Sequence, residues 1–249
     1  MTKKTLIALG VLAVVAFATT ASAYVLLSPR RTWSSPPTYI VDNRGLTGVN
    51  DGNGGETRTR NAIVSSAAWN GAGAGTVINA VVGSVSGFSL GDGTPMLNFR
   101  DPTGQCNGNC LAATFTGFFS GGTIFDADIV TNNSHSWTSM GEDPGGSGCS
   151  GEFYIEGVMV HEAGHGLGLG HTNVSGATMF PSVSSCNNNP ASTANDDDAA
   201  INDLYGGGGG IPANSCQGRC GQQAPAGCWC DFFCQFYGDC CPNKVQQCG

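Results

Sequence analysis

The stretch "HEAGHGLGLGH", residues 161–171, decides how this chain is interpreted, because it holds three of the four histidines. On an α-helix His161 and His165 lie one turn apart on the same face, so both imidazoles can reach one metal ion. Gly168 permits a backbone conformation that other residues resist, and we expect it to end the helix and turn the chain back. His171 is then predicted to be the third ligand of the same ion.

The three histidines indicate a catalytic zinc site. Three neutral imidazoles leave a fourth tetrahedral position open for water, whereas structural zinc sites use four protein ligands. Glu162 follows His161 directly and lies off the ligand strip, where it can take a proton from that water as a general base. The alternative is a set of packed or surface histidines in a glycine-rich helix. It is disfavoured because every fixed position of the pattern H-E-x-x-H-x-x-G-x-x-H is filled.

This pattern resembles that of the metzincin metalloproteases, and further segments are most similar to the matrixins, the matrix metalloproteinase branch. Metzincins carry a methionine-bearing turn below the metal, and "SGATMFP" supplies Met179 eight residues after His171. The segments "CLAATF", "GGTIFDADI" and "SWT" follow in matrixin order, and "DDDAAINDLYG" is similar to the closing helix of that domain. The resemblance covers most of residues 38–206. It implies a metzincin catalytic domain with a twisted mixed sheet, an active-site helix and a C-terminal helix.

Residue periodicity separately predicts an α+β domain, with strands first and helices mostly later. The predicted strands lie at residues 38–45, where the strand is closed by a turn, at 110–115 and at 121–132. The predicted helices are residues 58–73, 153–168 and 196–206. Gly71 is expected to stop the first helix, and Gly206 suits the end of the last. We expect a peptide substrate to lie extended against an edge strand at residues 111–115.

The chain departs from the matrixin pattern where matrixins hold a second, structural zinc. The positions that match histidine ligands of that zinc hold Ala113 and Ile124, and His135 is the remaining histidine. We therefore expect one catalytic zinc per chain and predict that His135 is an exposed loop residue. Asp126 and Asp128 are candidate ligands for Ca²⁺, as acidic residues are in related enzymes, but two alternating acids on a strand are as often simply solvated.

The first 23 residues, "MTKKTLIALGVLAVVAFATTASA", predict a secretory signal peptide cleaved after Ala23. The alternative of a membrane anchor is disfavoured, because the apolar run at residues 6–18 is well short of the roughly 20 residues of a spanning helix. Twelve cysteines agree with a secreted, extracellular protein, since disulfides persist in oxidising compartments. The net charge of −8 argues against a nucleic-acid partner.

Cysteines and glycines divide the rest of the chain into two domains. Eight of the twelve cysteines lie within the last 34 residues, and five consecutive glycines, residues 206–210, precede them. Because a glycine run has no side chains to pack, it predicts a flexible linker. The predicted organisation is a signal peptide at residues 1–23, a matrixin-like domain at 24–205, a linker at 206–214 and a small domain at 215–249.

The small domain is too short and too poor in aliphatic residues to build a core, so disulfides must hold it. Its cysteine spacing resembles the somatomedin B domain over the whole length, and the alternative of zinc-binding cysteines does not suit a secreted chain. That resemblance implies the pairs Cys216–Cys230, Cys220–Cys248, Cys228–Cys241 and Cys234–Cys240. By elimination, Cys106 is expected to pair with Cys110, and Cys149 with Cys186. Somatomedin B modules bind proteins, so we expect a protein partner here.

These features together predict a secreted zinc metalloendopeptidase with a C-terminal protein-binding module. The zinc-bound water would be the nucleophile and Glu162 the general base. Residues after Met179, including Pro181 and Val183, are expected to shape the pocket just past the scissile bond. One alternative is a secreted adhesion protein whose metzincin domain is inactive, and another is a zinc hydrolase that acts on something other than peptides. The general base at Glu162 argues against the adhesion protein, because a scaffold needs none.

Overall fold

The computed structural model describes residues 24–206 except residues 51, 53 and 143–147, together with a few residues of the C-terminal tail. The described tail residues are Gly221, Gln223, Trp229, Cys230, Asp231, Cys234 and Cys240. The predicted signal peptide, most of the linker and most of the cysteine-rich domain lie outside the described residues. The predicted domain boundaries therefore stay predictions.

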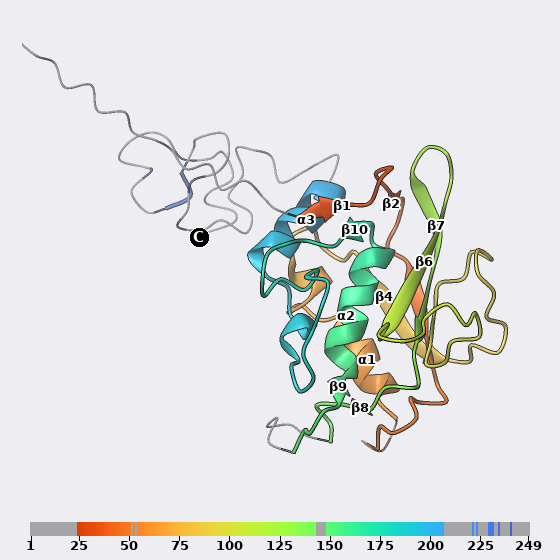
Figure 1. Ribbon diagram of the computed structural model, residues 1–249. Coiled ribbons are helices and arrows are strands. Elements are labelled where there is room, and N and C mark those ends of the chain that lie inside the picture. The colour runs from red at the N-terminus through yellow and green to blue at the C-terminus, as the bar shows by residue number, and fades with distance from the viewer. Residues whose placement is uncertain are drawn as a thin grey trace, which may run out of the picture.

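A mixed β-sheet forms the scaffold of the described part (Figure 1). Its strands are β2 (Thr32–Trp33), β3 (Thr38–Asp42), β4 (Asn79–Gly83), β5 (Met96–Asn98), β6 (Ala112–Phe118) and β7 (Thr123–Thr131). The order is β4-β3-β5-β7, all parallel, with β2 parallel to the first residues of β7 and β6 antiparallel along its other side. Strand β6 is thus an edge strand, and the predicted α+β class with a mixed sheet is confirmed.

Three helices and several short elements complete the domain. The helices are α1 (Glu56–Ile63), α2 (Ile155–Gly166) and α3 (Asn195–Tyr205), with single 3₁₀ turns η1 (Trp69–Gly71) and η2 (Asn189–Ala191). Two-residue strands form the pairs β1 (Val25–Leu26) with β10 (Leu169–Gly170) and β8 (Trp137–Thr138) with β9 (Phe153–Tyr154). Within the described residues no helix is long and apolar enough to cross a lipid bilayer.

Helix α2 lies between the sheet and the rest of the domain, beside the β6–β7 hairpin (Figure 1). Ten of its twelve residues are buried, so the helix is held by packing on nearly every side. A Cβ on Gly164 would overlap Met179 Sδ and come within 2.6 Å of the Trp69 ring. A glycine is needed there because the segment that carries Met179 packs directly on the helix backbone.

The first two predicted helices are shorter than the periodicity suggested, and so is the strand predicted at 121–132, which is β7. The helix predicted at 58–73 was wrong in extent, since α1 ends at Ile63 and a separate turn follows at η1. Ser65 Oγ accepts a hydrogen bond from the Ala67 amide, a local turn that competes with helical pairing. The helix predicted at 153–168 begins later because the Phe153 amide donates to Ser136 O instead.

The strand predicted at 38–45 is closed by a turn, as expected, and ends at Asp42. Residues 43–45 are not in the strand, because Asp42 Oδ1 accepts a hydrogen bond from the amide of Arg44 and turns the chain. Strands β4 and β5 had no predicted counterpart, since residues 72–105 are rich in turn residues and their strands are short.

Candidate active site

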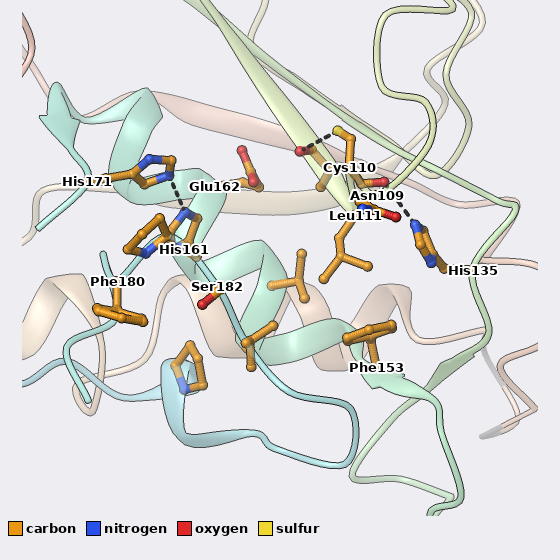
Figure 2. A pocket seen from close by; sticks show the side chains of 16 residues that line it. Asn109, Cys110, Leu111, His135, Phe153, His161, Glu162, His171, Phe180 and Ser182 are labelled. Atoms are coloured by element: carbon orange, nitrogen blue, oxygen red, sulfur yellow. Dashed lines mark hydrogen bonds between the residues drawn. The ribbon is translucent and has the colours of Figure 1, made fainter. Parts of the chain in front are cut away.

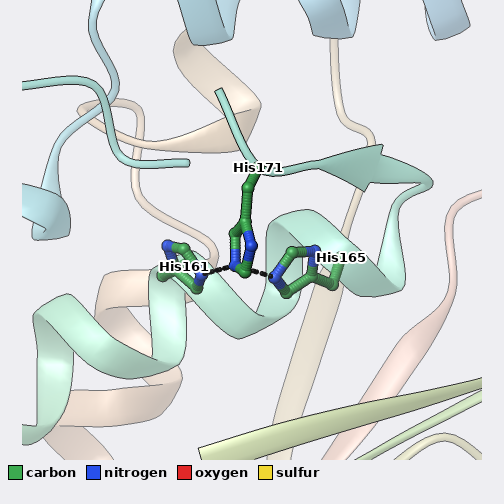
Figure 3. Close-up of side chains that lie close together, drawn as sticks. All are labelled: His161, His165 and His171. Atoms are coloured by element: carbon green, nitrogen blue, oxygen red, sulfur yellow. Dashed lines mark hydrogen bonds between the residues drawn. The ribbon is translucent and has the colours of Figure 1, made fainter. Parts of the chain in front are cut away.

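The structure brings the three predicted histidine ligands together (Figure 3). His161 and His165 project from one face of α2, and the chain after the helix returns through β10 to place His171 between them. His171 Nε2 lies 3.3 Å from Nε2 of His161 and 3.1 Å from Nε2 of His165. A tetrahedral zinc with bonds of about 2.0–2.1 Å holds its ligand nitrogens about 3.3 Å apart. The donor set and its spacing therefore fit one zinc ion.

Backbone carbonyls orient two of the imidazoles. His161 Nδ1 donates to Thr178 O at 2.6 Å, and His165 Nδ1 donates to Leu169 O at 2.8 Å. Because a carbonyl oxygen can only accept, the proton lies on Nδ1 and the lone pair of Nε2 is left for a metal. Burial also lowers the pKa of His165 and of His171, which favours the neutral form that can ligate.

Gly168 makes the return of the chain possible. It has φ +103°, in the left-handed region, and a Cβ there would overlap the carbonyl oxygen of Arg31. The Gly168 amide donates to His165 O, and its carbonyl accepts from the amide of Leu27. The glycine therefore does two things: it turns the chain toward His171, and it lets the N-terminal segment lie against the end of the helix.

The segment that carries Met179 lies against His161, because Thr178 O accepts the hydrogen bond from His161 Nδ1. Met179 is 2 % exposed, and its carbonyl accepts from the Thr172 amide one residue after His171. The amides of Thr178 and Met179 both donate to the buried carboxylate of Asp197 in the first turn of α3. Asp197 belongs to the segment that resembles the closing helix of matrixins, and its contacts with the turn at Met179 could not be read from spacing along the chain.

Glu162 lies next to the cluster and is held by a residue that the sequence did not single out. Its side chain is only 6 % exposed, and Oε2 accepts a hydrogen bond from Thr114 Oγ1 at 2.6 Å. Thr114 is in the edge strand β6, so the carboxylate is fixed between the helix and the sheet. Figure 2 shows Glu162 beside His161 and His171, at one end of a cavity.

Two cavities meet at this point, and both are lined by Ala112, Glu162 and His171. The first, the apolar cavity, has a volume of about 390 Å³. Its other walls include Leu111, Phe153, Val158, Phe180, Pro181 and Val183. The second, the Arg31 cavity, has a volume of about 350 Å³. Its other walls include Leu27, Arg31, Ala113, Thr114, Thr116 and His165.

His135 lies in a loop, as predicted, but it is half-buried rather than exposed, and it lines the wall of the apolar cavity (Figure 2). Its Nε2 lies 3.1 Å from the carbonyl oxygens of both Gly108 and Cys110, and its ring meets that of Phe153 edge-on at 5.7 Å. His135 thus fastens the loop that forms one wall of the cavity. This contact could not be predicted from the sequence, because His135 is far along the chain from Gly108 and Cys110.

Asp126 and Asp128 are not solvated, so that alternative is wrong. Their side chains are 0 % and 1 % exposed, and within the described residues neither oxygen of Asp126 has a hydrogen-bond partner. The Met96 amide donates to Asp128 Oδ1 at 3.2 Å. Burial, with the neighbouring charge of Asp126, raises the pKa of Asp128 to about 7. Two buried carboxylates with unused oxygens suit a hard cation such as Ca²⁺.

The described disulfides agree with the expected pairing. They are Cys106–Cys110, Cys149–Cys186 and Cys234–Cys240, and none of the described cysteines is free. The other three pairs involve cysteines outside the described residues and stay predictions.

Comparison with known proteins gives the same two families as the motifs. Residues 99–206 match the family model of Matrixin, peptidase M10, and residues 214–249 match that of the Somatomedin B domain. The chain is 34% identical over 122 residues to Matrilysin of Rattus norvegicus, covering 49% of this chain and 39% of that protein. It is 44% identical over 69 residues to Metalloendoproteinase 5-MMP of Arabidopsis thaliana, covering 25% of this chain and 19% of that protein.

These matches confirm the resemblance to matrixins and to somatomedin B. The chain spans less than two fifths of the length of either of these two relatives. The likeness is therefore one of segments, and it includes the histidines, Glu162 and the turn at Met179 within residues 99–206.

Proposed function

We propose that this chain is a secreted zinc metalloendopeptidase that hydrolyses peptide bonds in proteins. The observation that carries the proposal is the convergence of three imidazole Nε2 atoms beside the held carboxylate of Glu162, where two cavities meet. The likeness of residues 99–206 to the matrixins supports it.

His161, His165 and His171 would hold the zinc. When bound, the metal supplies Lewis acidity that polarises the scissile carbonyl and lowers the pKa of the attacking water. Glu162 takes a proton from that water and later delivers it to the leaving amine. The hydroxyl of Thr114 keeps the Glu162 carboxylate in one orientation during both transfers.

Strand β6 offers the binding surface for an extended substrate. Within the described residues it pairs with β7 alone, so the backbone groups on its other side are left for a peptide that adds as a further strand. The strand covers Ala112–Phe118, slightly later than the predicted edge at 111–115. The apolar cavity, with Pro181 and Val183 in its wall, would take the side chain just past the scissile bond.

Two metal assignments accompany the proposal. One zinc per chain is proposed, because Ala113 and Ile124 supply no ligand at the positions that match the structural zinc of matrixins. Calcium is proposed for Asp126 and Asp128, whose burial and unused oxygens favour a bound cation. A rise in the melting temperature on adding Ca²⁺ to chelated protein, absent in Asp126→Asn, would support the calcium site.

The alternatives are less well supported. An inactive adhesion protein would need neither Glu162 nor a threonine that orients it. A zinc hydrolase for other substrates would not need an edge strand open to β-augmentation beside the histidines. The somatomedin B-like tail is proposed to bind a protein partner and to act in targeting the enzyme.

The decisive experiment is incubation of the purified mature chain with a mixed peptide library, with and without a zinc chelator. We expect cleavage that the chelator abolishes and added zinc restores, with one zinc per chain by metal analysis. Two zincs per chain would contradict the single site. A zinc-loaded chain that cleaves no peptide would contradict the proposed activity.

A further inference from the structure

Arg31 is a charged side chain in the wall of the Arg31 cavity to which the proposed reaction gives no role. It is half-buried. Among the described residues, its guanidinium donates hydrogen bonds only to neutral acceptors. Nη1 donates to Thr116 Oγ1 at 2.7 Å, and Nη2 donates to Ser28 O at 3.3 Å. His165, His171 and Glu162 line the same cavity. A fixed positive charge therefore lies in a cavity that reaches the reacting groups.

The charge of Arg31 has no acidic partner in the part of the chain that the structure describes. The ion pairs there are Arg30–Asp203, Arg44–Asp42 and Arg100–Asp42. The acidic group that lines the cavity, Glu162, is held by Thr114. Because a guanidinium stays protonated at all ordinary pH values, the cavity can attract a carboxylate.

The structure holds this guanidinium in place. Its Cζ lies 3.8 Å from the centre of the Phe118 ring, a cation–π contact, while Thr116 fixes Nη1. The backbone is fixed as well, because the amide of the next residue, Thr32, donates to Gly122 O and β1 pairs with β10. A group that is already ordered loses little entropy when it binds a ligand.

The position of Arg31 along β6 decides which substrate residue it meets. From this part of the chain, residues 109–112 line the apolar cavity, and Ala112, Ala113, Thr114 and Thr116 line the Arg31 cavity. A peptide along β6 therefore passes from one cavity to the other. If the apolar cavity takes the residue after the scissile bond, the Arg31 cavity takes residues before it. Thr116, which holds Arg31, lies four residues beyond Ala112, which lines both cavities. Because paired strands advance residue by residue, Arg31 would meet a substrate residue up to about four positions before the scissile bond.

We propose that Arg31 is a specificity-determining residue that selects peptides with Asp or Glu two to four residues before the scissile bond. This inference rests on the proposed peptidase function. The recognition is a charge-assisted hydrogen bond between the guanidinium and the substrate carboxylate, on the side of the histidines opposite the apolar cavity. The substrate class is therefore an acidic peptide with an apolar residue just past the bond.

The test uses pairs of fluorogenic peptides that differ only by Glu or Gln at one of these three positions. For the native mature chain we expect kcat/KM to be about 3- to 10-fold higher for the best Glu peptide than for its Gln partner. This ratio should fall at high salt, because salt screens the attraction between the two charges. Arg31→Gln should bring this ratio to about 1, and Arg31→Lys should retain part of it. Arg30→Gln is the matched control, because Arg30 is paired with Asp203, and it should keep the native ratio.

Equal cleavage of all pairs by the native chain, or a preference that survives Arg31→Gln, would overturn the proposal. Binding of the same peptides to Glu162→Ala, measured by calorimetry, gives a readout that needs no turnover. A Glu-over-Gln affinity ratio that is lost in the Arg31→Gln, Glu162→Ala double variant supports the proposal even if no peptide is cleaved. Absence of cleavage by the native chain, with the affinity ratio present, would contradict the proposed peptidase activity but not the role of Arg31 in binding. Thermal unfolding of each variant shows whether the fold is kept.

Discussion

The apolar cavity and the Arg31 cavity share Glu162 and His171 but are built in different ways. The apolar cavity takes most of its walls from α2 and the segments that flank it in sequence, which the disulfide Cys149–Cys186 ties together. The Arg31 cavity takes its distinctive group from the N-terminal segment and its other walls from β6. The groups proposed for the chemistry are therefore close together in the sequence, whereas the proposed recognition by Arg31 depends on contacts between distant segments.

The largest effect on catalysis should come from substitutions of Glu162, whose carboxylate lines both cavities. Glu162→Ala is expected to keep zinc but to lower kcat about 10²–10⁴-fold for every peptide, because a general base contributes that much. Glu162→Gln is the matched variant, since it can keep the contact with Thr114 while losing the proton acceptor. Steady-state kinetics with metal analysis checks this. Near-normal turnover in either variant would show that the base is another group.

The next largest effect should come from removing the disulfide Cys149–Cys186, which ties together the segments that line the apolar cavity. Replacing Cys149 and Cys186 by Ser opens a bridge between residues 37 apart, which by loop entropy costs about 4 kcal/mol of unfolding free energy. The same change at Cys106 and Cys110, only four residues apart, should cost about 2 kcal/mol.

Denaturant unfolding measures the loss of unfolding free energy in both variants. Peptide kinetics shows which of the two cavities binds substrate less well. The amide of Cys186 donates to Glu152 O, so opening the bridge should loosen the cavity wall at Phe153 and Val183. We expect a higher KM for peptides with a large apolar residue after the scissile bond and an unchanged Glu/Gln ratio before it. A lower Glu/Gln ratio in this variant would mean that the two cavities are not independent.

The third prediction concerns Gly168, whose backbone packs against the carbonyl of Arg31. Gly168→Ala places a Cβ on a left-handed residue and against the carbonyl of Arg31, and we expect it to destabilise the fold by about 3 kcal/mol. Gly176→Ala is the matched control, because Gly176 has φ +90° but nothing within 4 Å of the added Cβ, so only about 1 kcal/mol should be lost. Equal costs for the two variants, measured by thermal unfolding, would show that the contact with Arg31 is not tight.

The smallest effect on either cavity should follow removal of the tail. Truncation after Gly206 is expected to leave hydrolysis of small peptides unchanged, since the described residues that line the two cavities all precede it. Binding to a large matrix protein should fall, because a tethered module raises the local concentration of its partner to roughly millimolar. A folded but inactive truncated chain would place the tail in the active site.

Much of the candidate site could be predicted from the sequence because its geometry is local. A helix fixes His161 and His165 on one face, and a single glycine turns the chain so that His171 faces them. The resemblance added Met179, and elimination among the cysteines suggested Cys149–Cys186, which the structure contains. Helix ends were less predictable, since the turn at Ser65 depends on a side-chain hydrogen bond that competes with periodicity.

The donor set, its proposed zinc and the α+β class could therefore be read from the sequence alone. These follow from residue type and from the periods of the helix and strand, which need no long-range information. Folding of the whole domain was needed to bring Thr114 to Glu162, to place His135 in the wall of the apolar cavity, and to put Arg31 and His171 in the lining of one cavity. These contacts arise from the order of strands in the sheet and from the closeness of the N-terminal segment to Gly168, which packing of the whole domain selects.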